Sequence, residues 1–178
     1  MIAAARAILE EADLDALTMA AVAERVGVRG PSLYKHVANR GLLIRAVAEE
    51  VATDLGRAIE RAAAGPSDPI AGLRAAVIAH RRYVRANPNG YGLLFAHLLP
   101  ESMPDTALVA TAGLPIVHRL EELVGQERAL EAARTLVAWA HGFVSMELSG
   151  AFRLGGDVDA AFAFGVGAVL RGITEPPL

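Results

Sequence analysis

Apolar residues recur at every third or fourth position along most of the chain, and no segment shows the two-residue alternation typical of a β-strand. This pattern predicts an all-α protein. The helix beginning near 70 is expected to end in the turn Asn87–Gly90. The expected helices cover residues 3–12, 18–26, about two turns from 31, 39–61, 70–86, 106–124 with an interruption at 115, 127–152 and 158–173.

The breaks between the first helices carry residues suited to helix ends. Thr18 and Asn39 are expected N-caps, because their side chains can accept a hydrogen bond from a free backbone N–H. Gly27 can take the positive φ that ends a helix, and Pro31 suits a first helical position. The helix from 39 to 61 would span roughly 30 Å. We expect it to connect a head, residues 1–45, to a body, residues 46–178.

Composition narrows the class of protein. The chain has 178 residues, of which 53% are hydrophobic, and it contains no cysteine. A disordered chain and a disulfide framework are therefore excluded. No apolar run approaches the roughly 20 residues of a membrane span, and Arg6, Glu10 and Glu11 interrupt any signal peptide. We expect a cytoplasmic protein without a membrane segment.

The net charge of −3 hides an uneven distribution of charge. Residues 25–48 contain five basic residues and no Asp or Glu, whereas the rest of the chain is acidic. Charge alone leaves two interpretations open, a solvated helix face and a surface that binds a polyanion. The basic residues in this window are Arg25, Arg29, Lys35, Arg40 and Arg45.

Two short helices joined by a four-residue turn containing Gly27 form a helix-turn-helix, whose second helix can enter the major groove of DNA. We expect Leu33 and Val37 to pack inward on Val22 and Val26. Residues on the outward face could then reach base edges, and those to its sides could meet phosphates. The alternative is an ordinary surface helix. The expected DNA-binding residues are Thr18, Arg29, Gly30, Pro31, Ser32, Tyr34, Lys35, His36 and Arg40.

At this point a family resemblance is clear. The segment "LDALTMAAVAERVGVRGPSLYKHVANRGLLIRAVAEEV" resembles the DNA-binding head of the TetR family of transcriptional regulators. The family features fall on Thr18, the turn 26–28, the "LY.H" pattern at 33–36 and the pair Asn39–Arg40. Val37 stands where the family usually has Phe, and Arg40 where it usually has Lys. The resemblance implies a homodimeric repressor on a near-palindromic operator.

A second, shorter resemblance lies near the C-terminus. "WAHGFVSMELSGAF", residues 139–152, is similar to the Trp-x-His-Gly motif of one C-terminal subgroup of TetR regulators. By analogy, the last two long helices would pair with those of a second copy. Stripes of small residues agree with this, although burial in a monomer's core is the alternative. The residues expected at the dimer interface are Ala138, Gly142, Ser145, Ser149, Ala161, Gly165, Ala168 and Gly172.

Aromatic and thioether side chains in the body are interleaved with histidines, as in an apolar pocket with a few polar groups. We expect a small, mostly apolar and neutral or weakly polar effector there, which releases the operator. The alternative is a regulator controlled by a protein partner, without such a pocket. The expected ligand-binding residues are His80, Tyr83, Tyr91, Phe95, Met103, His118, Trp139, His141, Phe143 and Met146.

The motifs of common enzymes do not occur in the sequence. No pair of histidines has a zinc-ligand spacing with a Glu, and neither a phosphate-binding glycine loop nor a nucleophile elbow is found. Glu121 and Glu122 are adjacent, so they point to different sides of a helix. We therefore expect no catalytic activity, no cofactor and no metal.

Overall fold

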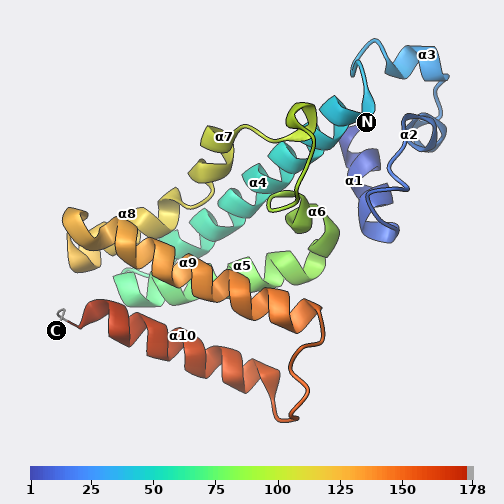
Figure 1. Cartoon of the computed structure of the whole chain (residues 1–178). Coiled ribbons are helices and arrows are strands. Elements are labelled where there is room, and N and C mark those ends of the chain that lie inside the picture. The colour runs from blue at the N-terminus through green and yellow to red at the C-terminus, as the bar shows by residue number, and fades with distance from the viewer. Residues whose placement is uncertain (176–178) are drawn as a thin grey trace. The chain divides into compact units, whose positions relative to one another are not determined.

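The computed structural model describes residues 1–175, which form α-helices and one short 3₁₀ turn and contain no β-strand (Figure 1). The all-α prediction is confirmed. None of the helices within this part of the chain is both long and apolar enough to cross a bilayer. The elements are α1 (Ile2–Glu11), α2 (Met19–Val26), α3 (Gly30–Leu33), α4 (Arg40–Ala64), α5 (Pro69–Ala86), α6 (Pro88–Leu93), η1 (Pro100–Ser102), α7 (Thr106–Thr111), α8 (Leu114–Val124), α9 (Gln126–Leu148) and α10 (Val158–Thr174).

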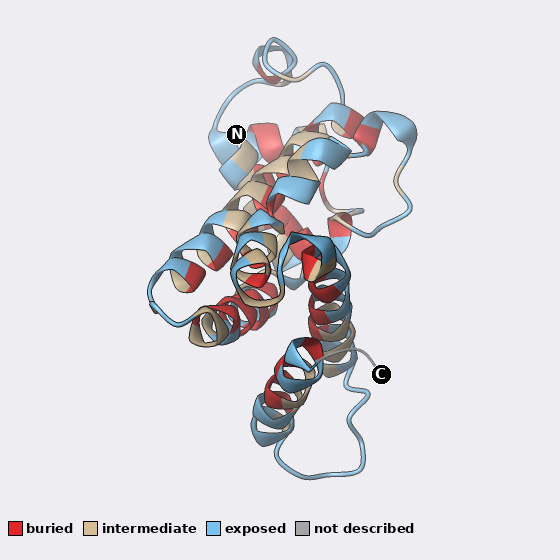
Figure 2. Ribbon diagram, turned by 90° about the vertical axis from the view of Figure 1, so that its left-hand side faces the viewer, coloured by how far each residue is buried: buried red, intermediate tan, exposed pale blue. Residues whose placement is uncertain are grey.

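These elements group into two compact units. The first unit contains residues 1–54 and 87–111, and the second contains residues 55–86 and those from 112 onward. Helix α4 contributes residues to both units. Buried residues, drawn red in Figure 2, form stripes along the helices, and exposed residues cover the opposite faces. This is the arrangement that the three- and four-residue spacing predicts.

The helix ends in the first unit follow the local sequence. The hydroxyl of Thr18 accepts a hydrogen bond from the N–H of Ala21 at 3.1 Å, and the Oδ1 of Asn39 accepts one from the N–H of Leu42 at 2.8 Å. Both predicted N-caps are therefore confirmed. Gly27 ends α2 with φ at 74°, in the left-handed region that a residue with a Cβ rarely adopts.

Two helices near the turns of the first unit differ from the sequence-based expectation. Helix α3 is only one turn long, although hydrogen bonds from the N–H groups of His36 and Val37 to the carbonyl of Leu33 continue it as turns. Residues 88–93 form α6, where we expected a simple turn. Pro88 has no N–H to leave unpaired, so it can begin this helix.

Two other helices are interrupted or shortened. The interruption expected near Pro115 is confirmed, since α7 and α8 are separate and Pro115 lies in the first turn of α8. Helix α9 ends before the expected residue 152. Ser149 is its C-cap, and Gly150 then takes a φ of 64°.

In the first unit, Arg6 of α1 is a central polar link. Its Nη1 donates to Asp54 of α4 at 2.6 Å, and its Nη2 donates to the side-chain oxygen of Asn87 at 2.6 Å. One guanidinium thus fastens α1 to α4 and to the residue that precedes α6.

Glu10 ties the other end of α1 to α6. Its carboxylate accepts hydrogen bonds from the N–H groups of Asn89 at 3.1 Å and Gly90 at 2.8 Å. The first N–H groups of a helix lack partners within the helix, so this carboxylate satisfies two of them. A Cβ at Gly90 would lie 2.8 Å from the Glu10 Oε1 and 3.0 Å from Val51. Only glycine allows this approach.

The second unit has its core among α5, α8 and α9, which make its closest contacts, and α10 packs on α9 and more loosely on α5. Because a single loop joins α9 to α10, the two helices run antiparallel (Figure 1). The largest fully buried side chains in this unit are Leu73, Val77, Val84, Leu120, Leu136 and Val144.

The C-terminal end of α4 is capped from α8. Arg119 donates to the carbonyl of Ala63 at 3.1 and 2.8 Å and to that of Pro66 at 3.1 Å. A Cβ at Gly72 would lie 2.8 Å from the same Ala63 oxygen, so glycine at this position lets α5 approach the capped end. These contacts fix the entry of α5 into the unit.

We predict that Glu10→Ala lowers the free energy of unfolding by about 1–2 kcal/mol, because two helix N–H groups lose a charged acceptor. Thermal or urea unfolding measures the loss, and amide hydrogen exchange at Asn89 and Gly90 localises it. Glu60→Ala is the matched control, since Glu60 is exposed on α4 and makes no hydrogen bond within the described residues. Equal stability of the two variants would contradict the capping role.

Candidate functional site

The turn between α2 and α3 is held by its own backbone. The N–H of Gly27 donates to the carbonyl of Glu24 at 3.0 Å, and the N–H of Val28 donates to that of Ala23 at 3.0 Å. Arg29 is extended, with φ at −75° and ψ at 144°, and begins α3 directly. The relative position of the two helices is therefore set by three residues without a long loop.

The outward face of α3 and the turns after it present polar side chains. Leu33 is the buried anchor, 2% exposed, as predicted. Val37 is half-buried. Val26 is 40% exposed, because it is the last residue of α2, where the chain turns away; its predicted packing on the inner side is wrong. The exposed residues of this region are Arg29, Pro31, Ser32, Tyr34, Lys35 and His36, and Gly30 is half-buried.

Acidic residues outside the basic window neutralise part of it. Arg25 donates to both oxygens of Glu11 at 2.6 and 2.5 Å, and this bond lowers the pKa of Glu11. Arg45 donates to Glu49 at 2.8 Å. The sequence window could not reveal these partners, because Glu49 lies just beyond its end and Glu11 lies on α1, outside the window. Fewer than five of the basic side chains in this window are therefore available to bind a polyanion, because Arg25 and Arg45 are each paired with a carboxylate.

Arg40 is used inside the head. Its Nε donates to the carbonyl of Leu17 at 2.6 Å, and its Nη2 donates to the carbonyl of Leu14. The structure thus gives Arg40 a positioning role in the loop between α1 and α2, and its phosphate contact expected from the sequence stays a prediction. Arg29 and Lys35, by contrast, make no hydrogen bond or ion pair with any residue that the structure describes.

The aromatic residues of the second unit stack on one another. The ring centroids of Trp139 and Phe162 lie 5.5 Å apart. The ring centroid of Phe143 lies 5.2 Å from that of Phe162 and 4.8 Å from that of Phe152. A Cβ at Gly165 would lie only 2.3 Å from the Trp139 ring. The small size of Gly165 is thus explained by packing of α9 on α10 within one chain, rather than by the expected second copy.

The residues expected to bind a ligand fall in both units, and only some of them meet. Tyr91, Phe95 and Met103 belong to the first unit and the others to the second. Phe95, Met103 and Met146 are exposed, as is His118 on α8, whereas Tyr91 is buried. Trp139 and Phe143 contact each other, with ring centroids 5.6 Å apart.

His80 lies in the core of the second unit, where it is 6% exposed. Burial and, to a smaller extent, the charge of His141 together lower its pKa from 6.5 to about 4. His80 is therefore a neutral imidazole at pH 7. Of the histidines expected to bind a ligand, the fold brings His80 and His141 close to each other.

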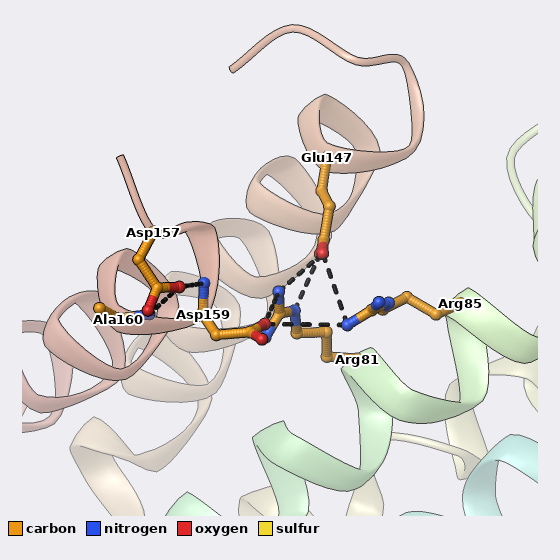
Figure 3. Close-up of polar contacts among 6 residues, drawn as sticks. All are labelled: Arg81, Arg85, Glu147, Asp157, Asp159 and Ala160. Carbon is orange, nitrogen blue, oxygen red and sulfur yellow. Dashed lines mark hydrogen bonds and ion pairs between the residues drawn. The ribbon is translucent and has the colours of Figure 1, made fainter. Parts of the chain in front are cut away.

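A polar cluster that the sequence did not predict joins three helices of the second unit (Figure 3). Arg81 of α5 donates from its Nε to Glu147 of α9 at 2.8 Å, and its Nη2 lies 2.6 Å from Glu147 and 2.7 Å from Asp159 of α10. Arg85 approaches the same two carboxylates at 3.7 and 3.8 Å. A groove of about 700 Å³ opens beside this cluster, between α5 and α10.

The small-residue faces of α9 and α10 differ in exposure. On α9, Ala138 and Ser145 are exposed and nothing lies within 4 Å of a Cβ at Gly142, while Ser149 follows the helix end. On α10, Ala161 and Gly172 are exposed and Ala168 is half-buried. Large apolar side chains are exposed on the same two helices: Leu130, Val137, Met146, Leu148 and Phe164, the last 75% exposed.

Two family descriptions match the sequence. Residues 1–47 match "Bacterial regulatory proteins, tetR family", and residues 73–169 match "Tetracyclin repressor-like, C-terminal domain". Rv0681 of Mycobacterium tuberculosis, described as an uncharacterized HTH-type transcriptional regulator, is 33% identical over 144 residues, which are 80% of this chain and 66% of that protein.

Solved structures share the fold. A protein of unknown function from Rhodococcus sp. RHA1 superposes with a TM-score of 0.83 at 22% identity, over 98% of this chain and 93% of that one. A TetR variant from Acinetobacter baumannii AYE in complex with minocycline gives a TM-score of 0.68 at 26% identity, over 96% of this chain and 92% of that one.

The buried His80 predicts a pH dependence of stability. Between about pH 6.5 and pH 4 the unfolded chain protonates this histidine and the folded chain does not, so stability falls as the pH falls. The loss amounts to about 3 kcal/mol over the interval. Urea unfolding at a series of pH values measures it, and His80→Gln should flatten the curve. His97→Gln, at an exposed histidine, should leave the curve unchanged; equal curves for the two variants would contradict this assignment.

Proposed function

The chain belongs to the TetR family of bacterial regulatory proteins, and from this premise we propose that it represses transcription by binding a near-palindromic operator as a homodimer. The observation that carries the DNA-binding part is the exposed face of α3, where Arg29 and Lys35 have no partner within the described residues. Paired recognition helices would enter successive major grooves roughly 34 Å apart. In this proposal the protein acts on the chromosome, in the cytoplasm.

We assign base reading to Arg29, Ser32 and Lys35, and phosphate contacts to Thr18, Tyr34 and His36. The assignment follows from position. Arg29 precedes α3 and Ser32 lies within it, while Thr18 lies exposed at the beginning of α2, whose N–H groups can face a phosphate. In this proposal residues 1–45 form the DNA-binding domain and residues 46–178 the regulatory and dimerisation domain.

We propose that the second copy pairs through α9 and α10. The open small-residue face of α9 and the exposed Phe164 of α10 support this, because contiguous exposed apolar surface on a regulator of this family is typical of an interface. The Trp139-x-His141-Gly142 motif would then mark the subgroup. Gly165 contributes to this interface only indirectly, by letting Trp139 pack on α10.

We propose that a small molecule bound in the body releases the operator. The TetR variant crystallised with minocycline supports an effector of this kind, and His80 with His141 beside Trp139 and Phe143 are the residues we assign to it. Such a molecule changes DNA binding only if it binds the non-DNA-binding conformation better. Helix α4, which has residues in both units, is the element through which this preference would be expressed.

The division of labour on α3 predicts different specificity profiles for two variants. Lys35→Ala should relax preference at one base position, worth about 1–3 kcal/mol, whereas Tyr34→Phe should weaken all sites alike. Selection from a randomised operator library measures both profiles. Glu60→Ala serves as the folded control. Identical profiles for the two variants would refute the division.

The proposed interface predicts that Ala138→Arg yields a monomer with weak operator binding, since a long cation would occupy the open face of α9. Sedimentation at micromolar concentration gives the oligomeric state. Ala64→Arg, at an exposed alanine near the end of α4, is the matched control and should remain dimeric. A dimeric Ala138→Arg would place the interface elsewhere. Gly165→Arg is unsuitable, because it would collide with Trp139 inside one chain.

A further inference from the structure

The groove between α5 and α10 has an unusual lining, and we call it the arginine groove. On the α5 side most of its residues are cationic, and on the α10 side most are apolar. Its volume of about 700 Å³ is in the range of small-molecule sites. It is lined by Arg74, Ile78, Arg81, Arg82, Arg85 and Ala86 of α5 and by Asp159, Phe162, Ala163 and Val166 of α10.

The spacing of the arginines explains why they share the groove. Arg81 and Arg85 lie seven and eleven residues after Arg74 and therefore project from the same side of α5, whereas Arg82 follows Arg81 directly and lies about 100° further around the helix. Arg74 and Arg82 are exposed and make no ion pair or hydrogen bond within residues 1–175. Arg85 has only two long contacts, at 3.7 and 3.8 Å. Four cations thus line the groove against one carboxylate, that of Asp159.

The two carboxylates bound to Arg81 are not equivalent. The side chain of Glu147 is 16% exposed and makes two hydrogen bonds, so it holds the guanidinium in a fixed orientation. The side chain of Asp159 is 74% exposed and makes one contact to Arg81, at 2.7 Å. Exposed ion pairs contribute little to stability, so Asp159 can be exchanged for another carboxylate at small cost.

The groove also offers an apolar surface next to its charges. The guanidinium carbon of Arg81 lies 4.4 Å from the ring centroid of Phe162, which is 4% exposed, and Val166 is 1% exposed. The apolar surface open to the groove is therefore that of Ile78, which is 47% exposed, and of the exposed Ala163. A purely inorganic anion would leave these side chains unused. A ligand with a charged head and an apolar body would satisfy both kinds of surface.

We propose that the arginine groove binds an organic anion whose carboxylate displaces Asp159 from Arg81 and Arg85 and whose apolar body lies along Ile78 and Ala163. A guanidinium suits a carboxylate, because its planar N–H groups can donate two parallel hydrogen bonds. Arg74 and Arg82 add charge that attracts the anion. This ligand is an anion, whereas the effector expected from the sequence is neutral or weakly polar. The residues that would bind it also differ from the expected ligand-binding residues.

The groove remains accessible in the proposed dimer. On α10, the residues lining it are centred roughly 140° around the helix from the stripe Ala161, Gly165, Ala168 and Gly172, at about 100° per residue. A second copy on the exposed residues of this side of α10, Ala161, Phe164 and Gly172, would therefore leave the groove open. The binding itself does not depend on DNA. Its use as a signal rests on the proposed function, because release of Asp159 would loosen the first turn of the helix that we assign to dimerisation.

The test compares octanoate with 1-octanol, which has the same chain length and no charge. Isothermal titration calorimetry on the full chain should show octanoate binding at least tenfold more tightly than 1-octanol. Arg82→Gln and Arg74→Gln should each weaken octanoate severalfold, and together by tenfold or more. Asp159→Asn should tighten it severalfold, since the internal competitor is removed. Arg134→Gln, at an exposed arginine of α9 outside the groove, is the matched control and should bind as the parent chain does.

Equal affinities for octanoate and 1-octanol, or octanoate binding unchanged in the double arginine variant, would overturn the proposal. Displacement of octanoate by equimolar inorganic phosphate would overturn the part that concerns the apolar body. Arg74 and Arg82 are exposed, so their variants should fold, and circular dichroism of each variant checks this. Operator binding and sedimentation of the same variants without octanoate test the proposed function separately, so its failure would leave the anion result standing.

Discussion

The ends of many short helices impose the main constraint on this fold, because each end leaves backbone groups without partners inside the helix. Distant charged side chains meet that need. Glu10 accepts from the first N–H groups of α6, Arg119 donates to the last carbonyls of α4, and Arg40 donates to carbonyls of the turn before α2. Each bond joins segments far apart in the sequence, so capping and tertiary structure are here the same interaction.

This constraint also decides which charges remain for binding. In the head, Arg40 is bound to backbone carbonyls of the turn before α2 and Arg25 and Arg45 are paired with acids, which leaves Arg29 and Lys35 on the face of α3. In the body, Arg119 is used in the same way, whereas Arg74 and Arg82 remain open beside α10. The number of basic residues in a sequence window therefore does not give the charge that is available for binding on either surface. A candidate binding site is identified by cations that make no hydrogen bond or ion pair with other described residues of the chain.

The sequence predicted features that depend on neighbouring residues, and missed those that depend on distant ones. Thr18, Gly27 and Asn39 act through residues three or four positions away, so their roles could be inferred and are confirmed. Helix α6 depends on Glu10, and the fit of Gly165 depends on Trp139 of another helix. Gly165 lies against α9 of its own chain, and the stripe of small residues alone could not distinguish this contact from the expected one with a second copy. The DNA-binding and ligand-binding residues remain predictions, because no bound molecule tests them.

Helix α10 is the element on which the regulatory proposals converge. It is held to its own chain by a buried aromatic contact at Trp139 and Phe162 and by the exposed ion pair of Asp159. The first is apolar and insensitive to dissolved ions, whereas the second can be replaced by any carboxylate that fits. A ligand shifts an equilibrium only by its preference for one state. An anion in the groove would therefore weaken the attachment of α10 only at its N-terminal turn, where it replaces Asp159. The aromatic contact would keep the rest of the helix in place.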